Sequence, residues 1–95
     1  MLVAIAQCES HQQQFNAKGT VLRGKVNPDD IGYFQINSHY NGADAAARGF
    51  DIYTEKGNIG YALYLYHTQG TRPWLASVNC WGNLSPPAMG DIAER

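Results

Sequence analysis

The chain has 95 residues, enough for one domain with a modest core, and its 44% hydrophobic and 16% charged residues are typical of a folded domain. Seven basic and eight acidic residues give a formal net charge of −1, so we expect neither nucleic acid nor an anionic membrane surface as a partner. The apolar runs are too short to span a bilayer, and we expect no membrane insertion.

The first residues have a helical pattern that starts without the usual N-terminal signals. Residues 2–13 are a predicted helix in which the i, i+3, i+4, i+7 spacing places four residues on one face: Leu2, Ile5, Ala6 and Glu9. Met1 leads into this run without an N-cap residue, a basic start or a cleavage site, so no complete signal peptide is visible. We interpret the chain as an excised domain, and a natural cytosolic start is the alternative.

Turn signals and a β-prone run follow this helix. Residues 20–22 (Thr-Val-Leu) lie between a turn signal at 16–19 and chain breakers at 24 and 27–29, which predicts a small hairpin or an ordered loop. Residues 31–37 are compact and mixed, with Gly32 among them, and predict a short helix or an irregular turn.

Helical patterns dominate the second half. Residues 41–48 predict a helix that stops at Gly49, and Thr54 is the expected N-cap of a longer helix that reaches about Gln69 and ends at Gly70. This longer helix is apolar nearly all round, so we expect it at the centre of the domain.

The C-terminal part predicts one more short helix and then a tail. Pro73 suits the first turn of a helix that carries Trp74 and Leu75. After Trp81 the periodicity ends, which divides the chain into one domain at 1–81 and an unstructured or loosely packed tail at 82–95.

The two cysteines, Cys8 and Cys80, match no zinc or redox spacing. A disulfide between them would close a long loop and contribute about 4 kcal/mol in the chain-entropy model. It would also imply an oxidising compartment. Two buried thiols are the alternative, and we favour the disulfide.

Two carboxyl groups in unlike settings are the candidate chemistry. Cleavage of a glycosidic bond needs an acid that stays protonated near neutral pH and a second carboxylate that stays ionised. Glu9, on the apolar stripe of the first helix, fits the first role because desolvation favours its neutral form. Asp29 and Asp30, on a polar loop, fit the second role. The alternative is that Glu9 is a hydrogen-bonded structural residue at the edge of the stripe.

Two segments together resemble the active-site region of the lysozyme superfamily. Cys8-Glu9-Ser10 is followed, after a loop, by Asp-Ile-Gly-Tyr-Phe-Gln-Ile-Asn-Ser at 30–38. Chicken-type lysozymes have Phe-Glu-Ser and then Asp-Tyr-Gly-Ile-Leu-Gln-Ile-Asn-Ser. Goose-type lysozymes and soluble lytic transglycosylases share the Glu-Ser pair and a Gly-Leu-Met-Gln-Ile block. Asn-Ile-Gly at 58–60 with Tyr-Leu at 64–65 resembles the long transglycosylase helix, so the resemblance covers roughly residues 4–81.

The resemblance implies a mainly α, lysozyme-like α+β fold with a small β-hairpin beside the active-site cleft. Position by position, it implies that Glu9 is the catalytic acid and Asp30 the nucleophile or charge stabiliser. Gln35 and Asn37 correspond to residues that line the sugar cleft. Gly32 corresponds to a glycine whose backbone passes close beneath the catalytic glutamate.

The implied activity is that of a muramidase, which cleaves the β-1,4 bond of peptidoglycan on the reducing side of N-acetylmuramic acid. The loop before Asp30 is longer than in chicken-type enzymes, so Asp29 is the reserve candidate. The Tyr-Asn-Ala-Gly block of transglycosylases is missing after the long helix, which weakens the transglycosylase interpretation. The presence of Asp30 is a second observation that favours hydrolysis. The alternatives are a lytic transglycosylase with 1,6-anhydro products and a non-catalytic peptidoglycan-binding module.

Other chemistry-bearing residues receive structural interpretations. Tyr33, inside the matched block, is the best candidate for stacking on a sugar. Three other tyrosines are expected to pack the long helix, namely Tyr61, Tyr64 and Tyr66, and the two tryptophans, Trp74 and Trp81, are expected to pack the core or the disulfide. The three histidines lack metal-ligand spacing, and a Ser-His-Asp triad of Ser10, His39 and Asp44 has no supporting motif. We expect no metal or cofactor, a monomer, and a secreted, periplasmic or wall-associated location.

Overall fold

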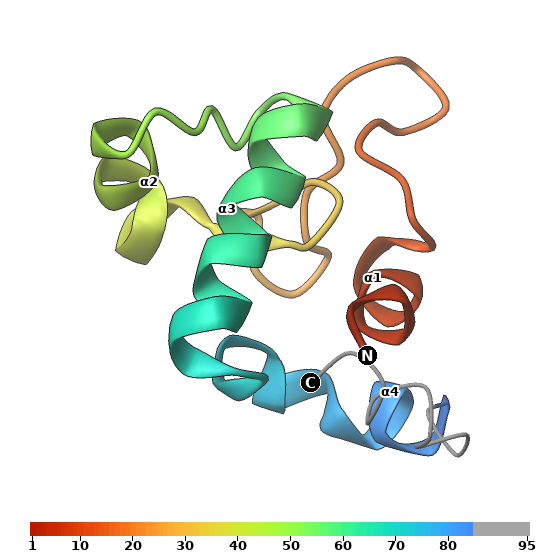
Figure 1. Cartoon of the computed structure of the whole chain (residues 1–95). Coiled ribbons are helices and arrows are strands. Elements are labelled where there is room, and N and C mark those ends of the chain that lie inside the picture. Colours follow the sequence, from red (N-terminus) through yellow and green to blue (C-terminus); the bar gives the residue numbers. More distant parts are fainter. Residues whose placement is uncertain (85–95) are drawn as a thin grey trace.

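The computed structural model describes residues 1–84, which form an α-rich domain around one two-stranded antiparallel hairpin (Figure 1). In chain order the elements are α1 (Leu2–Ser10), β1 (Asp30–Ile31), β2 (Ile36–Asn37), α2 (Ser38–Ala47), α3 (Glu55–Gln69), the 3-10 helix η1 (Arg72–Ser77) and α4 (Val78–Leu84). The expected mainly helical class with a small hairpin is therefore confirmed at this level.

Helix α1 ends three residues before the predicted Gln13. His11 adopts a left-handed φ of 57°, and the helix is capped by the His11 N–H on the carbonyl of Gln7 and by the Gln12 N–H on the carbonyl of Ala6. The Ser10 hydroxyl donates to the carbonyl of Tyr33 over 2.7 Å and accepts the N–H of Gln13 over 3.0 Å. These side-chain bonds turn the chain out of the helix at Ser10.

The hairpin lies later in the chain than the β-prone run at 20–22. Residues 11–29 form an ordered loop with two isolated bridges, Phe15 to Val21 and Arg23 to Ile31. The strands pair Asp30 with Asn37 and Ile31 with Ile36. Of the two alternatives for residues 31–37, the short helix is wrong: residues 32–35 form a turn, and the residues on either side of it belong to the two strands of the hairpin.

The middle helices are capped by side chains. Helix α2 starts at Ser38, earlier than predicted, because the Asn37 side chain accepts the N–H of Tyr40 and caps it. Helix α3 has the predicted limits: Thr54 accepts the N–H of Gly57, and Gly70 ends the helix. Figure 1 shows α3 running between α2 on one side and α1 on the other.

The last two helices follow α3 directly. Pro73 lies in the first turn of η1, as predicted. Helix α4 continues to Leu84, three residues past the boundary expected after Trp81. Residues 85–95 lie outside the described residues, so the tail there stays a prediction.

One core joins all these elements. Helix α1 packs against η1 and α4, α3 packs against η1, and α2 contacts β2. The buried hydrophobic residues are Ile5, Ala6, Ile31, Phe34, Ile36, Ala45, Ile52, Tyr61, Ala62, Leu65, Trp74 and Trp81. The expected central position of α3 is confirmed by Tyr61, Ala62 and Leu65, although Leu63 on the same helix is exposed.

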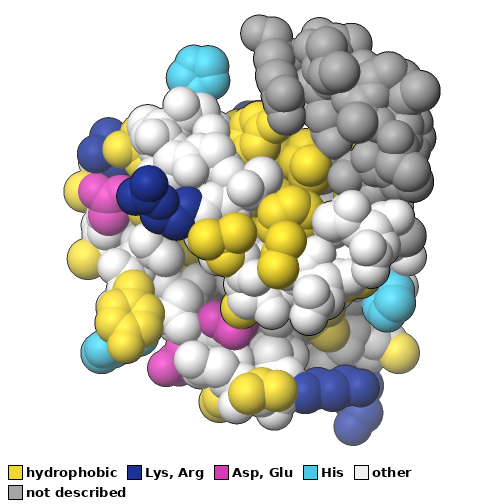
Figure 2. Space-filling model, turned by 90° about the horizontal axis from the view of Figure 1, so that it is seen from below, with side chains coloured by type: hydrophobic (Ala, Val, Ile, Leu, Met, Phe, Trp, Pro, Cys, Tyr) yellow, Lys and Arg dark blue, Asp and Glu magenta, His cyan; other side chains and the backbone are white. Residues whose placement is uncertain are grey.

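The surface is mixed in character. On the face drawn in Figure 2, hydrophobic side chains gather near the centre, one group of Lys and Arg side chains borders them on the left, and another lies at the lower right. Across residues 1–84, helices of the length and apolar character needed to cross a bilayer are absent.

Candidate active site

Glu9 and Asp30 line one pocket of about 200 Å³. Glu9 comes from the last turn of α1 and Asp30 from β1, so the fold brings together two carboxylates that are 21 positions apart (30 minus 9). The full lining is Glu9, Asp30, Gln35, Ile36, Asn37, Asn41, Leu65, Pro73, Trp74 and Ala76. The pocket therefore unites four of the six substrate-cleft and catalytic residues predicted from the sequence.

Glu9 occupies a desolvated position. It is half-buried, and burial is the largest influence on its carboxyl, whose pKa is raised above the usual value. The Ser77 hydroxyl donates a hydrogen bond to Oε2 and acts in the opposite direction, and the negative charge of Asp30 raises the pKa further. The net result favours a protonated Glu9, which is the state that a general acid needs.

Asp30 lies in a polar setting on the hairpin. Its cross-strand partner Asn37 donates from Nδ2 to Oδ1 of Asp30 over 3.0 Å. The other amide atom of Asn37, Oδ1, accepts the N–H of Tyr40 over 2.9 Å. One side chain therefore orients the carboxylate and caps α2, which fixes Asp30 relative to that helix.

Buried side chains hold the hairpin turn in place. Asn58 accepts the Phe34 N–H over 2.8 Å and donates to the carbonyls of Ile31 and Ile52. Gln14 accepts the Tyr33 N–H over 2.8 Å and donates to the carbonyl of Ile52. Backbone groups that the short strands leave unpaired thus obtain partners inside the protein.

Trp74 adds a third partner for the same turn. Its indole Nε1 donates to the carbonyl of Phe34 over 3.0 Å, and its ring packs against the Phe34 ring with centroids 5.8 Å apart. The expected core position of Trp74 is confirmed, and the same residue also lines the pocket. The turn is therefore anchored to α3 and to η1.

Gly32 and Tyr33 lie in the turn but outside the lining of the carboxylate pocket. Gly32 has a φ of 72°, and a Cβ there would come within 2.5 Å of the Gln14 side-chain amide. Its glycine requirement thus comes from a left-handed conformation and from close packing on Gln14. The Tyr33 side chain lines a separate, apolar depression between α1 and α3. The cleft roles of Gly32 and Tyr33 stay predictions that this geometry does not support.

Asp29 is exposed and is not a lining residue of the pocket. Its carbonyl accepts the N–H of Ser38 over 2.7 Å, which joins the loop to the start of α2. The geometry therefore favours Asp30 over Asp29 as the second carboxylate.

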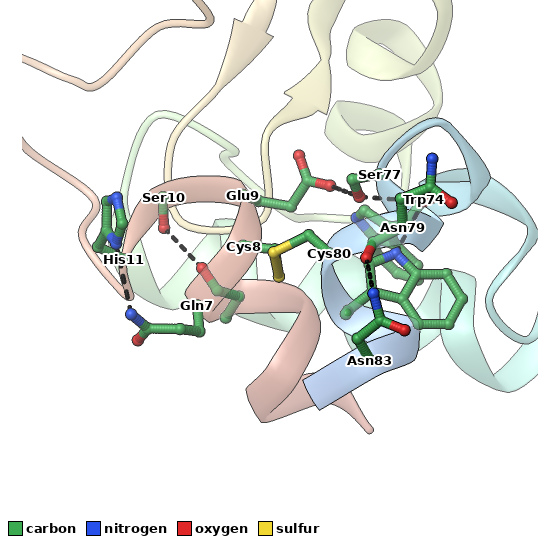
Figure 3. The surroundings of a disulfide bond; sticks show 12 residues. Gln7, Cys8, Glu9, Ser10, His11, Trp74, Ser77, Asn79, Cys80 and Asn83 are labelled. Atoms are coloured by element: carbon green, nitrogen blue, oxygen red, sulfur yellow. Dashed lines mark hydrogen bonds between the residues drawn. A yellow bond between two sulfur atoms is a disulfide. The ribbon is translucent and has the colours of Figure 1, made fainter. Parts of the chain in front are cut away.

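A disulfide lies next to Glu9. Cys8 and Cys80 are bonded, with Cα atoms 6.0 Å apart, which confirms the predicted bridge. Figure 3 shows it between α1 and α4, with Glu9 and Ser77 turned toward one another beside it. The disulfide therefore fixes α1 to the C-terminal helices at the level of the carboxylate.

Sequence reasoning missed two polar residues of this site, Ser77 and Asn41. Ser77 lies 68 positions from Glu9, and an isolated serine carries no motif. Asn41 lines the pocket from α2, and its Oδ1 is 3.4 Å from the Tyr61 hydroxyl. Only the packing of α2 on α3 reveals that position.

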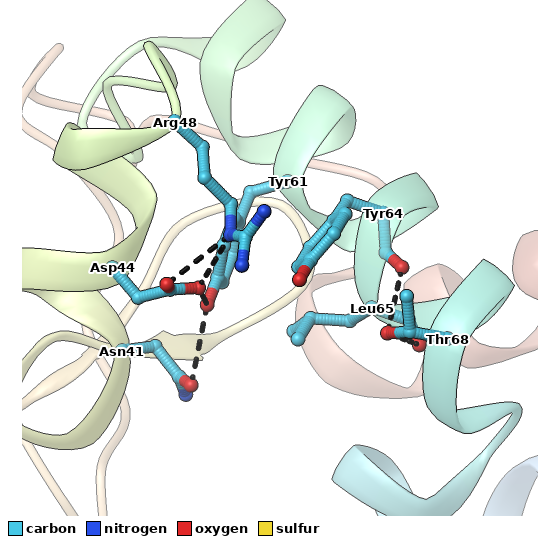
Figure 4. Close-up of polar contacts among 7 residues, drawn as sticks. All are labelled: Asn41, Asp44, Arg48, Tyr61, Tyr64, Leu65 and Thr68. Carbon is cyan, nitrogen blue, oxygen red and sulfur yellow. Dashed lines mark hydrogen bonds and ion pairs between the residues drawn. The ribbon is translucent and has the colours of Figure 1, made fainter.

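Asp44 and Arg48 form a polar cluster with Tyr61 next to Asn41 (Figure 4). Tyr61 donates from its hydroxyl to Oδ2 of Asp44 over 2.9 Å, and Asp44 pairs with Arg48 over 3.0 Å. Burial, followed by the Asp44 hydrogen bond, raises the pKa of Tyr61 to about 12, so this phenol stays protonated and remains a donor. The cluster attaches α2 to α3.

Within residues 1–84 the geometry supports neither a catalytic triad of Ser10, His39 and Asp44 nor a metal site. The Ser10 hydroxyl is bonded to the backbone of Tyr33, and Asp44 is bonded to Tyr61 and Arg48 rather than to a histidine. His11, His39 and His67 are exposed, and among the described residues no three His, Cys, Asp or Glu side chains gather as a metal site.

A larger hollow of about 690 Å³ lies over the start of α3. Its lining is mainly apolar and includes one carboxylate, Asp51, and one cation, Lys56. It lacks the pair of carboxyl groups in unlike settings, so the smaller pocket is the better candidate for acid catalysis despite its size.

In the comparisons with known proteins, the chain matches no family model, no curated protein and no solved structure.

Proposed function

We propose that the protein is a peptidoglycan glycosidase of lysozyme type, a muramidase that hydrolyses the β-1,4 bond between N-acetylmuramic acid and N-acetylglucosamine. The observation that carries the proposal is the pair of carboxylates in one pocket, one half-buried with a raised pKa and one hydrogen-bonded on a polar hairpin. This is the division of environments that glycosidic cleavage needs. The lysozyme-like α+β fold is part of the same proposal.

In this proposal Glu9 donates its proton to the glycosidic oxygen while the bond to the anomeric carbon breaks. Asp30 stabilises the positive charge that develops on the sugar ring, either as a nucleophile or through its field. Water then adds to the anomeric carbon and returns a proton to Glu9. Atoms and charge balance without a metal or cofactor.

The remaining pocket residues suit a sugar substrate. Gln35, Asn37 and Asn41 present side-chain amides, and Pro73 and Ala76 present exposed apolar surface. Sugar rings combine hydroxyl and acetamido groups with apolar faces, so a mixed lining of this kind matches them. A pocket of about 200 Å³ accommodates the reacting part of a strand, and the rest of the glycan would lie along the surface.

The disulfide fits an enzyme that works outside the cytosol. Such bonds persist in oxidising compartments, which agrees with a secreted, periplasmic or wall-associated location. Peptidoglycan is found in the same places.

The test is mass spectrometry of fragments released from purified peptidoglycan by the parent protein, Glu9→Gln and Asp30→Asn. We expect Glu9→Gln to lose activity by about 10³-fold, because loss of a general acid costs 10²- to 10⁴-fold. Glu55→Gln, which changes an exposed carboxylate in the first turn of α3, is the matched control and should retain full activity.

The fragments distinguish the alternatives. Products with intact reducing ends, together with a large loss in Asp30→Asn, support hydrolysis. Products lighter by one water, with activity retained in Asp30→Asn, mean a lytic transglycosylase that uses Glu9 alone. If Glu9→Gln releases the same fragments at the same rate as the parent, Glu9 is not the catalytic acid and the proposed mechanism is wrong. If neither protein releases fragments, a peptidoglycan-binding module becomes the better interpretation.

A further inference from the structure

The Ser77 hydroxyl lies between two acceptors, Oε2 of Glu9 and the carbonyl oxygen of Trp74, which is 3.1 Å away. A serine hydroxyl has one proton and can donate to only one of them at a time. The Trp74 carbonyl already accepts the indole N–H of Trp81 over 2.9 Å. Donation from Ser77 to Glu9 therefore leaves no buried carbonyl without a partner.

We propose that Ser77 is a positioning residue that holds Oε2 of Glu9 as an acceptor and so directs the acidic proton to Oε1. This inference rests on the proposed function of Glu9 as the general acid. Figure 3 shows the second carboxyl oxygen of Glu9 pointing away from Ser77, on the side of the strands. Asp30 belongs to β1 and lines the same pocket as Glu9, so the inference places the proton on the oxygen that lies away from Ser77, on the side of the hairpin.

The hydrogen bond also acts on the reaction itself. As Glu9 transfers its proton it becomes a carboxylate, and a donor bonds more strongly to a carboxylate than to a neutral acid. Ser77 therefore stabilises the product of proton transfer without contacting the sugar. Its influence opposes burial, the largest influence on the Glu9 pKa. Burial thus favours the protonated acid, and Ser77 favours the carboxylate that forms when the proton is released.

The fold fixes this contact at its two ends. Cys8 directly precedes Glu9, and Cys80 lies three residues after Ser77, so the disulfide closes beside the Glu9–Ser77 hydrogen bond. A covalent bond and a hydrogen bond thus join the same two segments side by side. The serine hydroxyl has little freedom to move away from the carboxyl.

The groups that face Glu9 from each neighbouring element are few among the described residues. The hairpin contributes the negative charge of Asp30, which raises the pKa of Glu9, and η1 contributes Ser77, which lowers it. The other polar lining residues are neutral amides from the hairpin and α2: Gln35, Asn37 and Asn41. A change in the Glu9 titration on replacement of Ser77 can therefore be assigned to the lost hydroxyl.

The experiment is a carbon-13 NMR titration of the Glu9 side chain in the parent, Ser77→Ala and Ser77→Thr, with kcat and KM measured against pH on peptidoglycan fragments. In Ser77→Ala we expect the Glu9 pKa to rise and the high-pH limb of kcat/KM to move upward with it. We also expect kcat to fall about tenfold while KM stays within about twofold. A hydrogen bond to a charged group stabilises it by enough free energy to change a rate about tenfold or more. Ser77→Thr keeps a hydroxyl and should restore the parent titration.

Thr68→Val is the matched control. The Thr68 hydroxyl donates only to carbonyls of its own helix, Tyr64 and Leu65, so its removal should leave the Glu9 titration unchanged. An identical Glu9 titration in Ser77→Ala and the parent would overturn the inference. The titration needs no substrate, so it decides the role of Ser77 toward Glu9 even if Glu9→Gln retains activity and the proposed function fails.

Discussion

The two carboxylates of the candidate site stand on walls that are held in different ways. The Glu9 wall consists of α1, η1 and α4, and its segments come from the two ends of the described chain, joined by the Cys8–Cys80 disulfide. The Asp30 wall consists of the β1–β2 hairpin and the start of α2, and hydrogen bonds from buried side chains hold it. In the Glu9 wall a covalent bond joins segments that are distant in the sequence. In the Asp30 wall buried side chains bind the backbone of a local hairpin and so join it to the core.

The difference follows from what each wall lacks. Two-residue strands pair few backbone groups, and an isolated hairpin of this size is not stable in water, so the Asp30 wall needs partners for its turn. The Glu9 wall has its backbone bonds within helices and needs only to be kept together. A disulfide does this by restricting the unfolded chain, because it closes a loop across 72 positions.

The largest effect should come from breaking the Asp30 wall at Asn58. In Asn58→Leu the buried N–H of Phe34 loses its acceptor and the Ile31 carbonyl loses a donor. We expect a loss of about 3–5 kcal/mol in the free energy of unfolding, since each orphaned buried group costs 1–3 kcal/mol. Urea denaturation measures it, and hydrogen exchange should show early opening at the Phe34 amide.

The control for that variant is Asn83→Ala. The Asn83 side chain is exposed and donates only to the carbonyl of Asn79 in its own helix, so its loss should change stability by less than about 0.5 kcal/mol. Parent-like protection of the Phe34 amide in Asn58→Leu would show that the turn does not depend on this side chain.

The second effect, on the Glu9 wall, should be smaller. Removal of the disulfide in a Cys8→Ala/Cys80→Ala variant should cost about 2–4 kcal/mol. Amides of α1 and α4 should exchange faster at low denaturant, while those of Tyr33 and Phe34 keep their order of protection. Reductant should destabilise the parent by a similar amount and leave the double variant unchanged. Equal loss of protection in both walls would mean that they unfold as one unit and that the comparison fails.

The two walls also differ in how far the sequence predicted them. Glu9 was found because a carboxylate ended an apolar stripe on a helix, and the disulfide because only two cysteines are available. Asp30, Gln35 and Asn37 are predicted through a motif, and the resemblance also implies a hairpin beside the cleft, but the local pattern does not locate the strands of this hairpin. Its strands are two residues long, too short for an alternating pattern to show.

The parts that were missed depend on contacts between distant positions. Gln14 and Asn58 look like ordinary polar residues in the sequence, yet both are almost completely buried against the turn. Ser77 meets Glu9 only because η1 packs on α1. Helix caps such as Thr54 and Gly70 are local signals, and those were predicted correctly. What spacing along the chain cannot give is the pairing of one buried polar group with another.

The smallest expected effect is the change in stability with pH when Glu9 itself is replaced. Its pKa is raised in the folded state, mainly by burial, so the folded protein binds more protons than the unfolded chain between the two pKa values. Stability is therefore fully present below the ordinary carboxyl pKa and falls as the pH rises through the folded pKa. Glu9→Gln removes this titration and keeps an acceptor for Ser77. We expect it to be slightly more stable than the parent at pH 7, by about 1 kcal/mol or less, and to lose that advantage at about pH 4.

Thermal melts of the parent and Glu9→Gln at the two pH values measure the difference. Glu55→Gln is the control with the opposite sign, because Glu55 is exposed in the first turn of α3 and its negative charge is favourable there. It should be equal to or slightly less stable than the parent at pH 7. A Glu9→Gln protein that is less stable than the parent at pH 7 would mean that the ionised carboxylate is well accommodated. Glu9 would then be a structural residue of this wall, and its surroundings would not favour the protonated acid at a cost in stability.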